Sequence, residues 1–599
     1  MVKNKLVGAV SLIALVTFLF AVQTSARQGG AATGVMTGSV KSAAGAAMEG
    51  VGVSARHQNQ TYTTTVYTDR GGNYTFPPLD AGQYRMWAQT VGFEAAWAEK
   101  QLAGGSAQQN FSLTGAAPDV VKRQLSGSEW MASLPDATPE DRRGKQIFSN
   151  QCTGCHTASW VLQSRFDEKG WGIIIDVMSR SSLDFSPTAR RDEMMQHYKK
   201  DLAAYLARVR GPQDMSTPKP HPRPSGDATQ VVITEYDLPR PDMPGYLQVH
   251  NGSDWSDGTP TRYYGRGPHD VVVDADGMAW IADDTIPERS LAKLDPRTGK
   301  VTEYKLPDQK TGSAVSTHTL MMDEKSNTVW TNNGNDDEFL SLDPRTGTFK
   351  RWPRQEGIKF DVGGTLTVDL EGNPWAPSGD GAIKLDVKTG RYSEYPAPTP
   401  GLGTYGIATD GRSNVWYSSP GGDRVVKVDN RTGDSTEVVV GPKKDLPFIT
   451  PFDLEAYTKL RQGANVGTPQ MKGPRRGGGD TNGNYVWFGE FQGNSLLRLD
   501  IRDNSTKEYP MPVPYSNPYA AVVDKNHDVW INMVNADRVS RFNPTTEKFT
   551  EYVMPTRGTE VRHIGVDNRP AVPEIWVCYD RPNKIARLQL RPSPGSGAR

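Results

Sequence analysis

The sharpest chemical motif in this sequence is Cys152-Thr153-Gly154-Cys155-His156. One helical turn can present two thiols at this spacing to the vinyl groups of a haem, and the adjacent imidazole can then reach the iron as its proximal ligand. A thioredoxin-like site would need a surrounding βαβ pattern, and a zinc site would need a second cysteine pair. The chain has three cysteines and neither pattern. The motif therefore predicts covalently bound haem c, held by Cys152 and Cys155, with His156 on the iron.

Three histidines form a second set of residues suited to chemistry. His269, His318 and His563 each precede a tryptophan by eleven to thirteen residues, and Tyr405 and Tyr519 take the same place before two others. We expect this place to be the start of the innermost strand in each unit of a repeat. Imidazoles at equivalent positions of adjoining units can form one cluster that moves protons or binds a metal. The three histidines are therefore candidate catalytic residues.

Carboxylates are expected beside these histidines. If the turn at 275–277 joins strands 269–274 and 278–283, His269 lies directly across from Asp283. A carboxylate in that position can orient the imidazole or share a metal ion with it. Glu490 is the counterpart of Asp283 in another unit, three residues after Trp487.

Helices must position the haem motif. Thr138-Pro139-Glu140-Asp141 has a capping residue, a proline at the first helical position and acids in the first turn, which predicts a helix leading into the motif. A second helix is predicted over residues 191–209, where apolar residues recur at helical spacing. We expect a helical unit over residues 136–211.

This helical pattern resembles class I cytochrome c, in which a late helix packs across the first one. The resemblance implies a methionine as the second iron ligand. Met178 is the preferred candidate because it precedes a loop between helices, whereas Met194 and Met195 fall inside a helix, where core packing is their expected role. His197 is a further candidate ligand, although a surface position on the helix suits it better.

A tryptophan repeat dominates the second half of the chain. Each tryptophan tends to follow a turn with Asp or Asn and to precede a segment like Leu294–Gly299 and then one like Thr302–Pro307. The steps between successive tryptophans are 50, 45, 41, 71, 43 and 46 residues. Apart from the step of 71, which contains an insertion, they match the period of about 40–50 residues that is typical of propeller blades with four short strands each. The tryptophans are Trp280, Trp330, Trp375, Trp416, Trp487, Trp530 and Trp576.

The repeat predicts a seven-bladed β-propeller over residues 230–592, after a proline-rich linker at 212–229. The last unit ends near Leu590 without its outer strand, and a matching strand occurs at 233–239, so we expect this strand to close the ring. Two insertions, 240–265 and 441–479, interrupt the period. The first carries Tyr246, Trp255, Tyr263 and Tyr264, and we expect the helical unit to dock on it.

The propeller repeat resembles the virginiamycin B (streptogramin) lyase family. The resemblance implies a histidine base in the last blade, a histidine in the preceding blade, and acids that hold Mg²⁺. His563 matches the base and Glu560 lies near the expected acid, while Tyr519 and Tyr579 stand where the family has a histidine and an acid. If the family's pattern is moved by one blade along the ring, His563, His269 and Asp283 form a set similar to the family's histidines and acid.

The N-terminal region contains two further segments. Lys3 and Lys5, an apolar run from Leu6 to Val22 and the small residues at 24–26 predict a signal peptide over residues 1–26, and hence export to the periplasm. Residues 33–115 alternate with period two between Gly- and Asp-containing turns, which predicts half-buried strands. The run from Thr68 to Phe93 resembles the carboxypeptidase regulatory-like domain, which implies a small β-sandwich. The expected fold is therefore mainly β, with helices between the sandwich and the propeller.

Composition excludes some functions and leaves three open. The chain has 68 basic and 68 acidic residues, and zero net charge does not favour nucleic-acid binding. The first hypothesis is an exported c-type haem protein that passes electrons between a partner protein and a substrate on the propeller. The second is a Mg²⁺-dependent C–O lyase with His269 or His563 as base. The third is a platform that binds a glycan or a protein.

Overall fold

The computed structural model describes residues 33–180, 189–213, 216–239, 267–283, 289–308, 312, 314–315, 317–333, 337–460, 462–463, 465–580 and 583–592. The predicted signal peptide and the insertion at 240–265, with its four aromatic residues, lie outside these ranges. Within them, no helix combines the length and the apolar character needed to cross a membrane. The fold is mainly β, as the sequence predicts.

The first unit, residues 33–113, is a β-sandwich with a buried apolar core. In one sheet β1 pairs with β4, β5, β8 and β9, and the other sheet has the order β3-β2-β6-β7. Met36, Val53 and Met86 are fully buried between the sheets, because alternate side chains of each strand face inward. The strands are β1 (Thr33–Ser42), β2 (Gly52–His57), β3 (Tyr62–Tyr67), β4 (Asn73–Thr75), β5 (Leu79–Asp80), β6 (Gly82–Gln89), β7 (Ala96–Leu102), β8 (Gly105–Gln108) and β9 (Phe111–Leu113).

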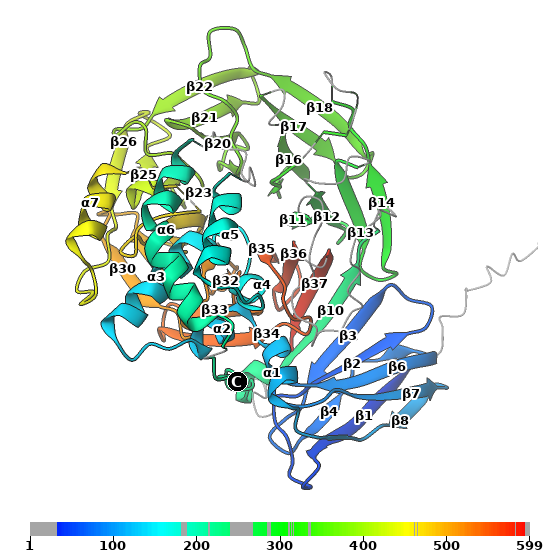
Figure 1. The fold of residues 1–599 in the computed structure, drawn as a ribbon. Helices are drawn as coiled ribbons and strands as arrows, with labels where there is room; N and C mark the ends of the chain where they lie inside the picture. The colour runs from blue at the N-terminus through cyan, green and yellow to red at the C-terminus, as the bar shows by residue number, and fades with distance from the viewer. Residues whose placement is uncertain are drawn as a thin grey trace, which may run out of the picture.

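The second half of the chain forms a ring of antiparallel sheets (Figure 1). Three of the strand sets run as β11 (Pro268–Val273), β12 (Ala279–Asp283), β13 (Leu291–Asp295), β14 (Lys300–Tyr304); β15 (Met321–Asp323), β16 (Thr328–Asn333), β17 (Glu338–Asp343), β18 (Thr348–Pro353); and β19 (Thr367–Val368), β20 (Pro374–Ser378), β21 (Gly381–Asp386), β22 (Arg391–Pro396). In each set, neighbours in sequence pair with one another.

The ring continues with the same pattern. The next strands are β23 (Ile407–Thr409), β24 (Val415–Ser419), β25 (Arg424–Val428), β26 (Ser435–Val439); β27 (Pro474–Gly479), β28 (Tyr485–Glu490), β29 (Ser495–Asp500), β30 (Thr506–Pro510); β31 (Pro518–Val523), β32 (Val529–Met533), β33 (Arg538–Asn543), β34 (Lys548–Val553); and β35 (Val561–Asp567), β36 (Glu574–Tyr579), β37 (Lys584–Leu590). One parallel bridge, Arg476↔Ala520, joins β27 to β31.

The repeated tryptophan has a structural reason. Trp280 Nε1 donates to the Asp274 carboxylate at 2.8 Å, and Asp274 also accepts from backbone N–H groups of its own turn. The same indole-to-aspartate bond recurs for Trp375, Trp416 and Trp530 at 3.0, 2.8 and 2.8 Å. Each tryptophan is fully buried, so the bond satisfies a polar group that would otherwise be left unpaired.

Strand β10 (Val231–Asp237) has two partners. It pairs with β37 from Val231↔Leu590 to Asp237↔Lys584, so an N-terminal strand completes the last sheet of the ring, as the sequence predicts. Its other edge pairs with β3, from Val232↔Val66 to Tyr236↔Tyr62. The sandwich and the ring therefore share one eight-stranded sheet, β35-β36-β37-β10-β3-β2-β6-β7.

A helical unit lies across one part of the ring (Figure 1). Helix α3 begins at Pro139, with Thr138 and Asp141 in a capping box, and α6 packs across it. A Cβ atom at Gly144 would lie 2.4 Å from the Tyr205 ring, so only glycine allows this approach. The helices are α1 (Pro118–Gln124), α2 (Gly127–Ser133), α3 (Pro139–Cys152), α4 (Ala158–Leu162), α5 (Glu168–Arg180), α6 (Ala189–Val209) and α7 (Pro451–Lys459), with short 3₁₀ turns η1 (Gly226–Thr229) and η3 (Pro420–Gly422).

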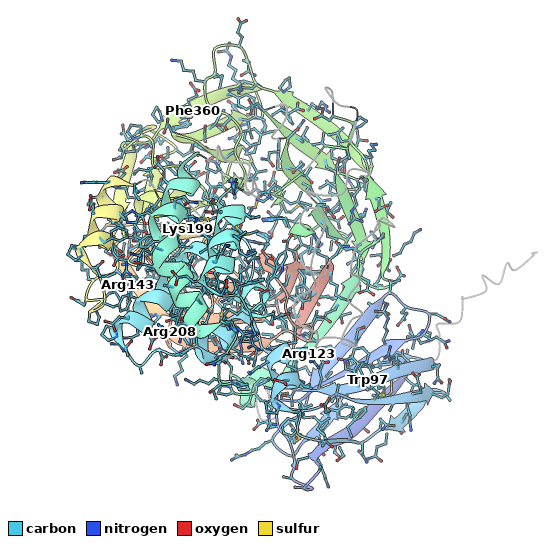
Figure 2. All side chains as sticks on the ribbon, in the orientation of Figure 1. Trp97, Arg123, Arg143, Lys199, Arg208 and Phe360 are labelled. Atoms are coloured by element: carbon cyan, nitrogen blue, oxygen red, sulfur yellow. The ribbon has the colours of Figure 1, made fainter. Side chains whose placement is uncertain are left out.

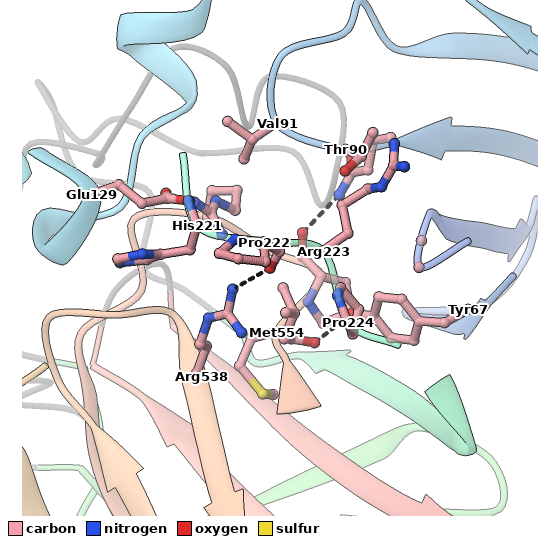
Figure 3. A pocket seen from close by; sticks show the side chains of 16 residues that line it. Tyr67, Thr90, Val91, Glu129, His221, Pro222, Arg223, Pro224, Arg538 and Met554 are labelled. Carbon is pink, nitrogen blue, oxygen red and sulfur yellow. Dashed lines mark hydrogen bonds and ion pairs between the residues drawn. The ribbon is translucent and has the colours of Figure 1, made fainter. Parts of the chain in front are cut away.

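The described part of the linker is held by hydrogen bonds to the helical unit and the ring. The His221 backbone N–H donates to Glu129 at 2.9 Å, and Arg538 Nη2 donates to the Pro222 carbonyl at 3.0 Å. Figure 3 shows these residues around a cavity of about 60 Å³ where the sandwich, the helical unit and the ring meet. The proline-rich segment thus packs between these three units, and we call this place the three-way junction.

Candidate functional site

Charged and aromatic side chains of the inner strands meet inside the ring. Several of these strands have a bulge, where their pairing with the next strand shifts register. Strands β11, β27 and β31 each begin with a proline, and their register shifts between Pro268 and Val271, Pro474 and Gly477, and Pro518 and Ala521. A bulge bends the strand and re-aims the residues inside it. Strand β35 has a similar shift between Val561 and His563. We call the side chains that meet near these shifts the channel cluster: His269, Asp270, His318, Tyr405, Arg475, Arg476, Tyr519, Arg562 and His563.

Asp270 is the hub of this cluster. Its carboxylate receives Nδ1 of His269 at 2.7 Å, the Leu320 backbone N–H at 3.1 Å and Arg476 Nη1 at 2.8 and 2.9 Å. Although burial opposes ionisation, Arg476 outweighs it and holds the pKa of Asp270 well below its usual value. Asp270 is therefore an anion that fixes both an imidazole and a guanidinium.

Two histidines of the cluster, His269 and His563, are neutral at neutral pH. Burial, and then the adjacent His318, lower the pKa of His269 well below its usual value, and burial lowers the pKa of His563 to about 4. The rings of His269 and His318 lie 3.8 Å apart. Nε2 of His269 and Nδ1 of His563 have no hydrogen-bond partner among the described residues. With Asp270 on Nδ1, His269 presents Nε2 as a proton acceptor.

Three arginines surround the ring of Tyr519. The guanidinium carbons of Arg475, Arg476 and Arg562 lie 5.3, 5.6 and 5.7 Å from its centroid. Burial alone would raise the pKa of Tyr519, but the arginines outweigh it and lower that pKa. The phenols of Tyr405 and Tyr519 are hydrogen-bonded to each other. The hydroxyl of Tyr519 thus gives up its proton more readily than an ordinary phenol.

The predicted pairing of His269 with Asp283 is wrong. The bulge in β11 places Pro268, not His269, opposite Asp283, because an extra residue shifts the register. Asp283 forms an ion pair with Arg289 at 2.6 Å. The carboxylate that orients His269 is its neighbour in sequence, Asp270.

The other predicted acids are also held by specific groups. Glu560 pairs with Arg562, and Tyr579 donates to Glu235 at 2.9 Å. Glu490 is fully buried and accepts from Ser495. Burial, and then the nearby Glu508, raise the pKa of Glu490 to about 8.

The Cys152–His156 motif lies against the ring beside the channel cluster. Arg562 Nη2 donates to the Cys155 carbonyl at 3.0 Å, and Arg562 precedes His563 in β35. A Cβ atom at Gly154 would lie 2.2 Å from the Asn465 carbonyl oxygen, so the glycine of the motif allows this close approach. The side chain of Asn465 in turn accepts from Arg475 at 2.7 Å.

The helical unit docks on the second insertion of the ring. Arg143 Nη2 and Tyr198 Oη both donate to Asp453 of α7, at 2.9 and 3.0 Å (Figure 2 labels Arg143). Asn150 and Gln151 donate to the carbonyls of Thr468 and Gly467, both at 2.7 Å. These contacts join the helical unit to residues 441–479. The expected docking partner, the insertion at 240–265, lies outside the described residues, so that prediction stays open.

The candidate haem residues have the following positions. Cys152 ends α3 and is half-buried, Cys155 is buried, and the His156 ring lies 5.0 Å from Trp160. Met178 is partly buried in α5 against the helical core, while Met194 and Met195 are fully or nearly fully buried in it. His197 stacks on Phe452 of α7 at 3.7 Å, which gives it a packing role.

Comparisons with known proteins concern the two β units. Residues 35–114 match the carboxypeptidase regulatory-like domain family. Virginiamycin B lyase from Staphylococcus aureus is 19% identical, with 54% of this chain and 95% of that one covered and a TM-score of 0.42. A streptogramin B lyase is 20% identical, with 61% and 100% covered and a TM-score of 0.45.

A third solved structure is the β-propeller domain of Cps50 (Swd1) from Myceliophteria thermophila, which is 10% identical, with 54% and 96% covered and a TM-score of 0.40. No curated protein matches the chain. The first unit is thus a carboxypeptidase regulatory-like domain, and the ring has propeller neighbours.

The channel cluster does not fit a Mg²⁺ site. Mg²⁺ prefers oxygen ligands, chiefly carboxylates. The one carboxylate of the cluster, Asp270, faces an arginine, and the two other predicted acids, Asp283 and Glu560, do the same. Within the described ranges, no three His, Cys, Asp or Glu side chains are grouped so as to hold a metal ion.

Sequence reasoning missed the arginines. Arg476 precedes Trp487 by eleven residues, the same spacing that singled out His269 and Tyr519. Applying the rule to the unit of Trp487 as well would have found it. Arg562 and Asp270 had a weaker signal, since each is only a sequence neighbour of a predicted histidine.

Proposed function

We propose that this chain is an exported c-type haem protein in which the helical unit exchanges electrons with a substrate bound at the channel cluster of a seven-bladed propeller. One observation carries the proposal: Arg562 contacts the Cys155 carbonyl on one side and the Tyr519 ring on the other. The motif suited to haem and the groups suited to acid–base chemistry are therefore separated by a single side chain.

The donor set fits haem. Cys152 and Cys155 would hold its vinyl groups and His156 would bind its iron, with Met178 the preferred second ligand. The packing of α6 across α3 at Gly144 supports a cytochrome-like helical unit. When bound, haem supplies one-electron transfer. The site also needs a partner protein that takes or gives these electrons, and export to the periplasm would supply the compartment in which such haem is attached.

The chain's own residues would manage the proton that accompanies an electron. His269 is fixed by Asp270 at Nδ1 and is neutral, so Nε2 can accept a proton from a substrate that loses an electron. The buried ion pair of Asp270 with Arg476 keeps the imidazole oriented. Electron and proton would thus leave toward different groups, the helical unit and His269.

Expression with a haem-attachment system tests the proposal. The purified protein should show reduced c-type absorption bands and carry haem that survives denaturation. The double change Cys152→Ala/Cys155→Ala should remove the covalent haem, whereas Cys578→Ala, which changes the buried third cysteine in β36, should retain it. Wild-type protein without covalent haem would overturn the proposal.

A second function, C–O lyase activity, is favoured by the His269–Asp270 pair. A neutral imidazole held by a carboxylate is the arrangement of a general base, which can abstract a proton next to a carbonyl. A streptogramin B or another cyclic ester is the substrate to test, with and without chelator. His269→Ala and His563→Ala should each abolish turnover. Turnover that survives both changes would rule this function out.

A further inference from the structure

One side of the Arg476 guanidinium group is hydrogen-bonded to the protein, and the other side has no hydrogen-bond partner among the described residues. Its Nη1 donates to both oxygens of Asp270 at 2.8 and 2.9 Å. Its Nε and Nη2 have no hydrogen-bond partner among the described residues, and the residue is only 5% exposed. Buried guanidinium donors without an acceptor are strongly unfavourable. This edge therefore calls for an acceptor that the described chain does not provide.

The geometry of the edge selects the acceptor. Nε–H and Nη2–H of an arginine point in the same direction and match the two oxygens of a carboxylate, which they bind in a bidentate fork. Asp270 fixes the opposite side of the group, so the fork is held in place before any ligand arrives. A carboxylate is the acceptor that this arrangement suits best.

The surroundings favour an anion. Arg475 and Arg562 lie around the same phenol ring as Arg476, and Nε of Arg562 also has no hydrogen-bond partner in the described ranges. His269 and His563 are neutral. Charges interact more strongly in such a buried site than in water.

The walls of the cluster are aromatic. The ring centroids of Tyr405 and Phe491 each lie 6.2 Å from that of Tyr519, and Arg475 stacks on Phe491 at 3.9 Å. Flat rings in this arrangement suit an aromatic ligand by edge-to-face contact.

We infer that the channel cluster binds an aromatic carboxylate, with its carboxylate on the Nε–Nη2 edge of Arg476 and its ring near Tyr519 and His269. The inference rests on the proposed function for the role of the cluster as a substrate site, and it adds the chemical class of that substrate. An internal alternative exists: an ionised Tyr519 phenol could serve as the anion for these donors. In that case no carboxylate would bind.

Calorimetric titration of the full-length, haem-loaded protein with benzoate and with benzamide tests the inference. Benzoate should bind at least tenfold more tightly than its neutral isostere, because only the carboxylate satisfies the fork. Arg476→Lys keeps the charge, removes the fork and should weaken benzoate at least tenfold. Arg502→Lys, at an exposed ion pair in the same strand set, should leave binding unchanged.

Equal affinity for benzoate and benzamide, no binding of either, or unchanged affinity in Arg476→Lys would overturn the inference. If Arg476→Lys does not fold by circular dichroism, the benzoate–benzamide pair on the wild-type protein decides. Ultraviolet titration supplies the second measurement: tyrosinate absorbance near neutral pH that benzoate does not change would identify Tyr519 as the internal anion and overturn the inference.

The double variant Cys152→Ser/Cys155→Ser separates this inference from the proposed function. It cannot attach haem but keeps the channel cluster, so it should bind benzoate as the wild type does. Benzoate binding by a wild-type protein that carries no haem would support the inference and overturn the proposed function. Attached haem without benzoate binding would do the reverse.

Discussion

At the scale of single residues, the ring buries several charges as ion pairs. Asp270 faces Arg476, and Glu560 faces Arg562. A buried charge is tolerated when it is paired and hydrogen-bonded, and removing one partner is costly. Glu490 is neutral instead of paired: its pKa is raised to about 8, so it holds a proton at neutral pH.

The raised pKa of Glu490 predicts a pH-dependent stability. Between the usual glutamate pKa and about 8, the folded protein holds a proton that the unfolded chain releases, so stability falls as pH rises through this window. Glu490→Gln keeps an acceptor for Ser495 and removes the titration. Its thermal midpoint should therefore exceed that of the wild type at pH ~8 by an amount equivalent to a few kcal/mol, and match it near pH ~5.

Differential scanning calorimetry across this range checks the prediction. Glu455→Gln, an exposed change on α7, is the control and should follow the wild-type profile. Parallel profiles for Glu490→Gln and the wild type would contradict the predicted direction.

The residue types of the candidate site were easier to predict than their partners. Spacing from each tryptophan found the histidines because inner-strand positions repeat with the blade. The partner of His269 could not be found in the same way, since a bulge changes register by one residue and leaves no periodic signal. Pro268, Pro474 and Pro518 mark the bulged strands, but their common role is visible only once the strands are paired.

At the scale of elements, helix α7 is one attachment point of the helical unit. Asp453 is fully buried and accepts from Arg143 of α3 and Tyr198 of α6. It also caps its own helix through Thr450. One carboxylate thus ties three helices together, two from the helical unit and one from the ring.

Asp453→Asn tests this tie. Asparagine can still cap α7, but it leaves the largely buried Arg143 without its main counter-charge, and we expect a loss of about 3 kcal/mol. Hydrogen exchange measured by mass spectrometry should accelerate in α3 and α6, while exchange in the distant sheet β15–β18 stays unchanged. Asp201→Asn removes the second, 40% exposed partner of Arg143 and should cost about 1 kcal/mol or less. Equal exchange in the two variants would argue against Asp453 as the attachment point.

Element boundaries followed local signals where these existed. The capping sequence at Thr138 predicted the start of α3, and the lone strand near Ile233 predicted the closure by β10. The pairing of β3 with β10 had no such signal, because two edge strands that are far apart in sequence meet only through the packing of whole units. The same holds for the docking of α3 on residues 441–479.

At the scale of the whole molecule, the shared sheet makes the sandwich part of the ring's closure. Strand β3 covers the outer edge of β10 along Val232–Tyr236. An uncovered edge strand offers unpaired backbone groups to other chains. The carboxypeptidase regulatory-like domain therefore also acts as an edge cover.

A chain that begins at residue 116 should expose this edge and self-associate. Size-exclusion chromatography with light scattering should show larger species than for a chain that begins at residue 33, which retains β3. Identical elution behaviour relative to chain mass would show that the edge of β10 needs no cover.

Acidification should loosen the three-way junction at His221. Burial lowers the pKa of His221 to about 4, and Arg538 and Arg557 reinforce this while Glu129 opposes it. The folded state therefore keeps this ring neutral below the pH at which the unfolded chain protonates it. Stability is present above the usual histidine pKa and is lost as pH falls toward about 4, by roughly 2 kcal/mol for a partly exposed ring.

Small-angle scattering should accordingly show one compact particle at neutral pH and an expanded one near pH ~4, where the junction has lost this contribution. Because His269 and His563 titrate in the same direction, a local measurement is needed: hydrogen exchange of residues 216–225 and of α2. His221→Gln should protect both segments to lower pH than the wild type. His527→Gln, at a ring that is 53% exposed, should not. A mobile helical lobe at neutral pH would contradict the wedged linker, and equal exchange in both variants would remove His221 as the acid-sensitive group.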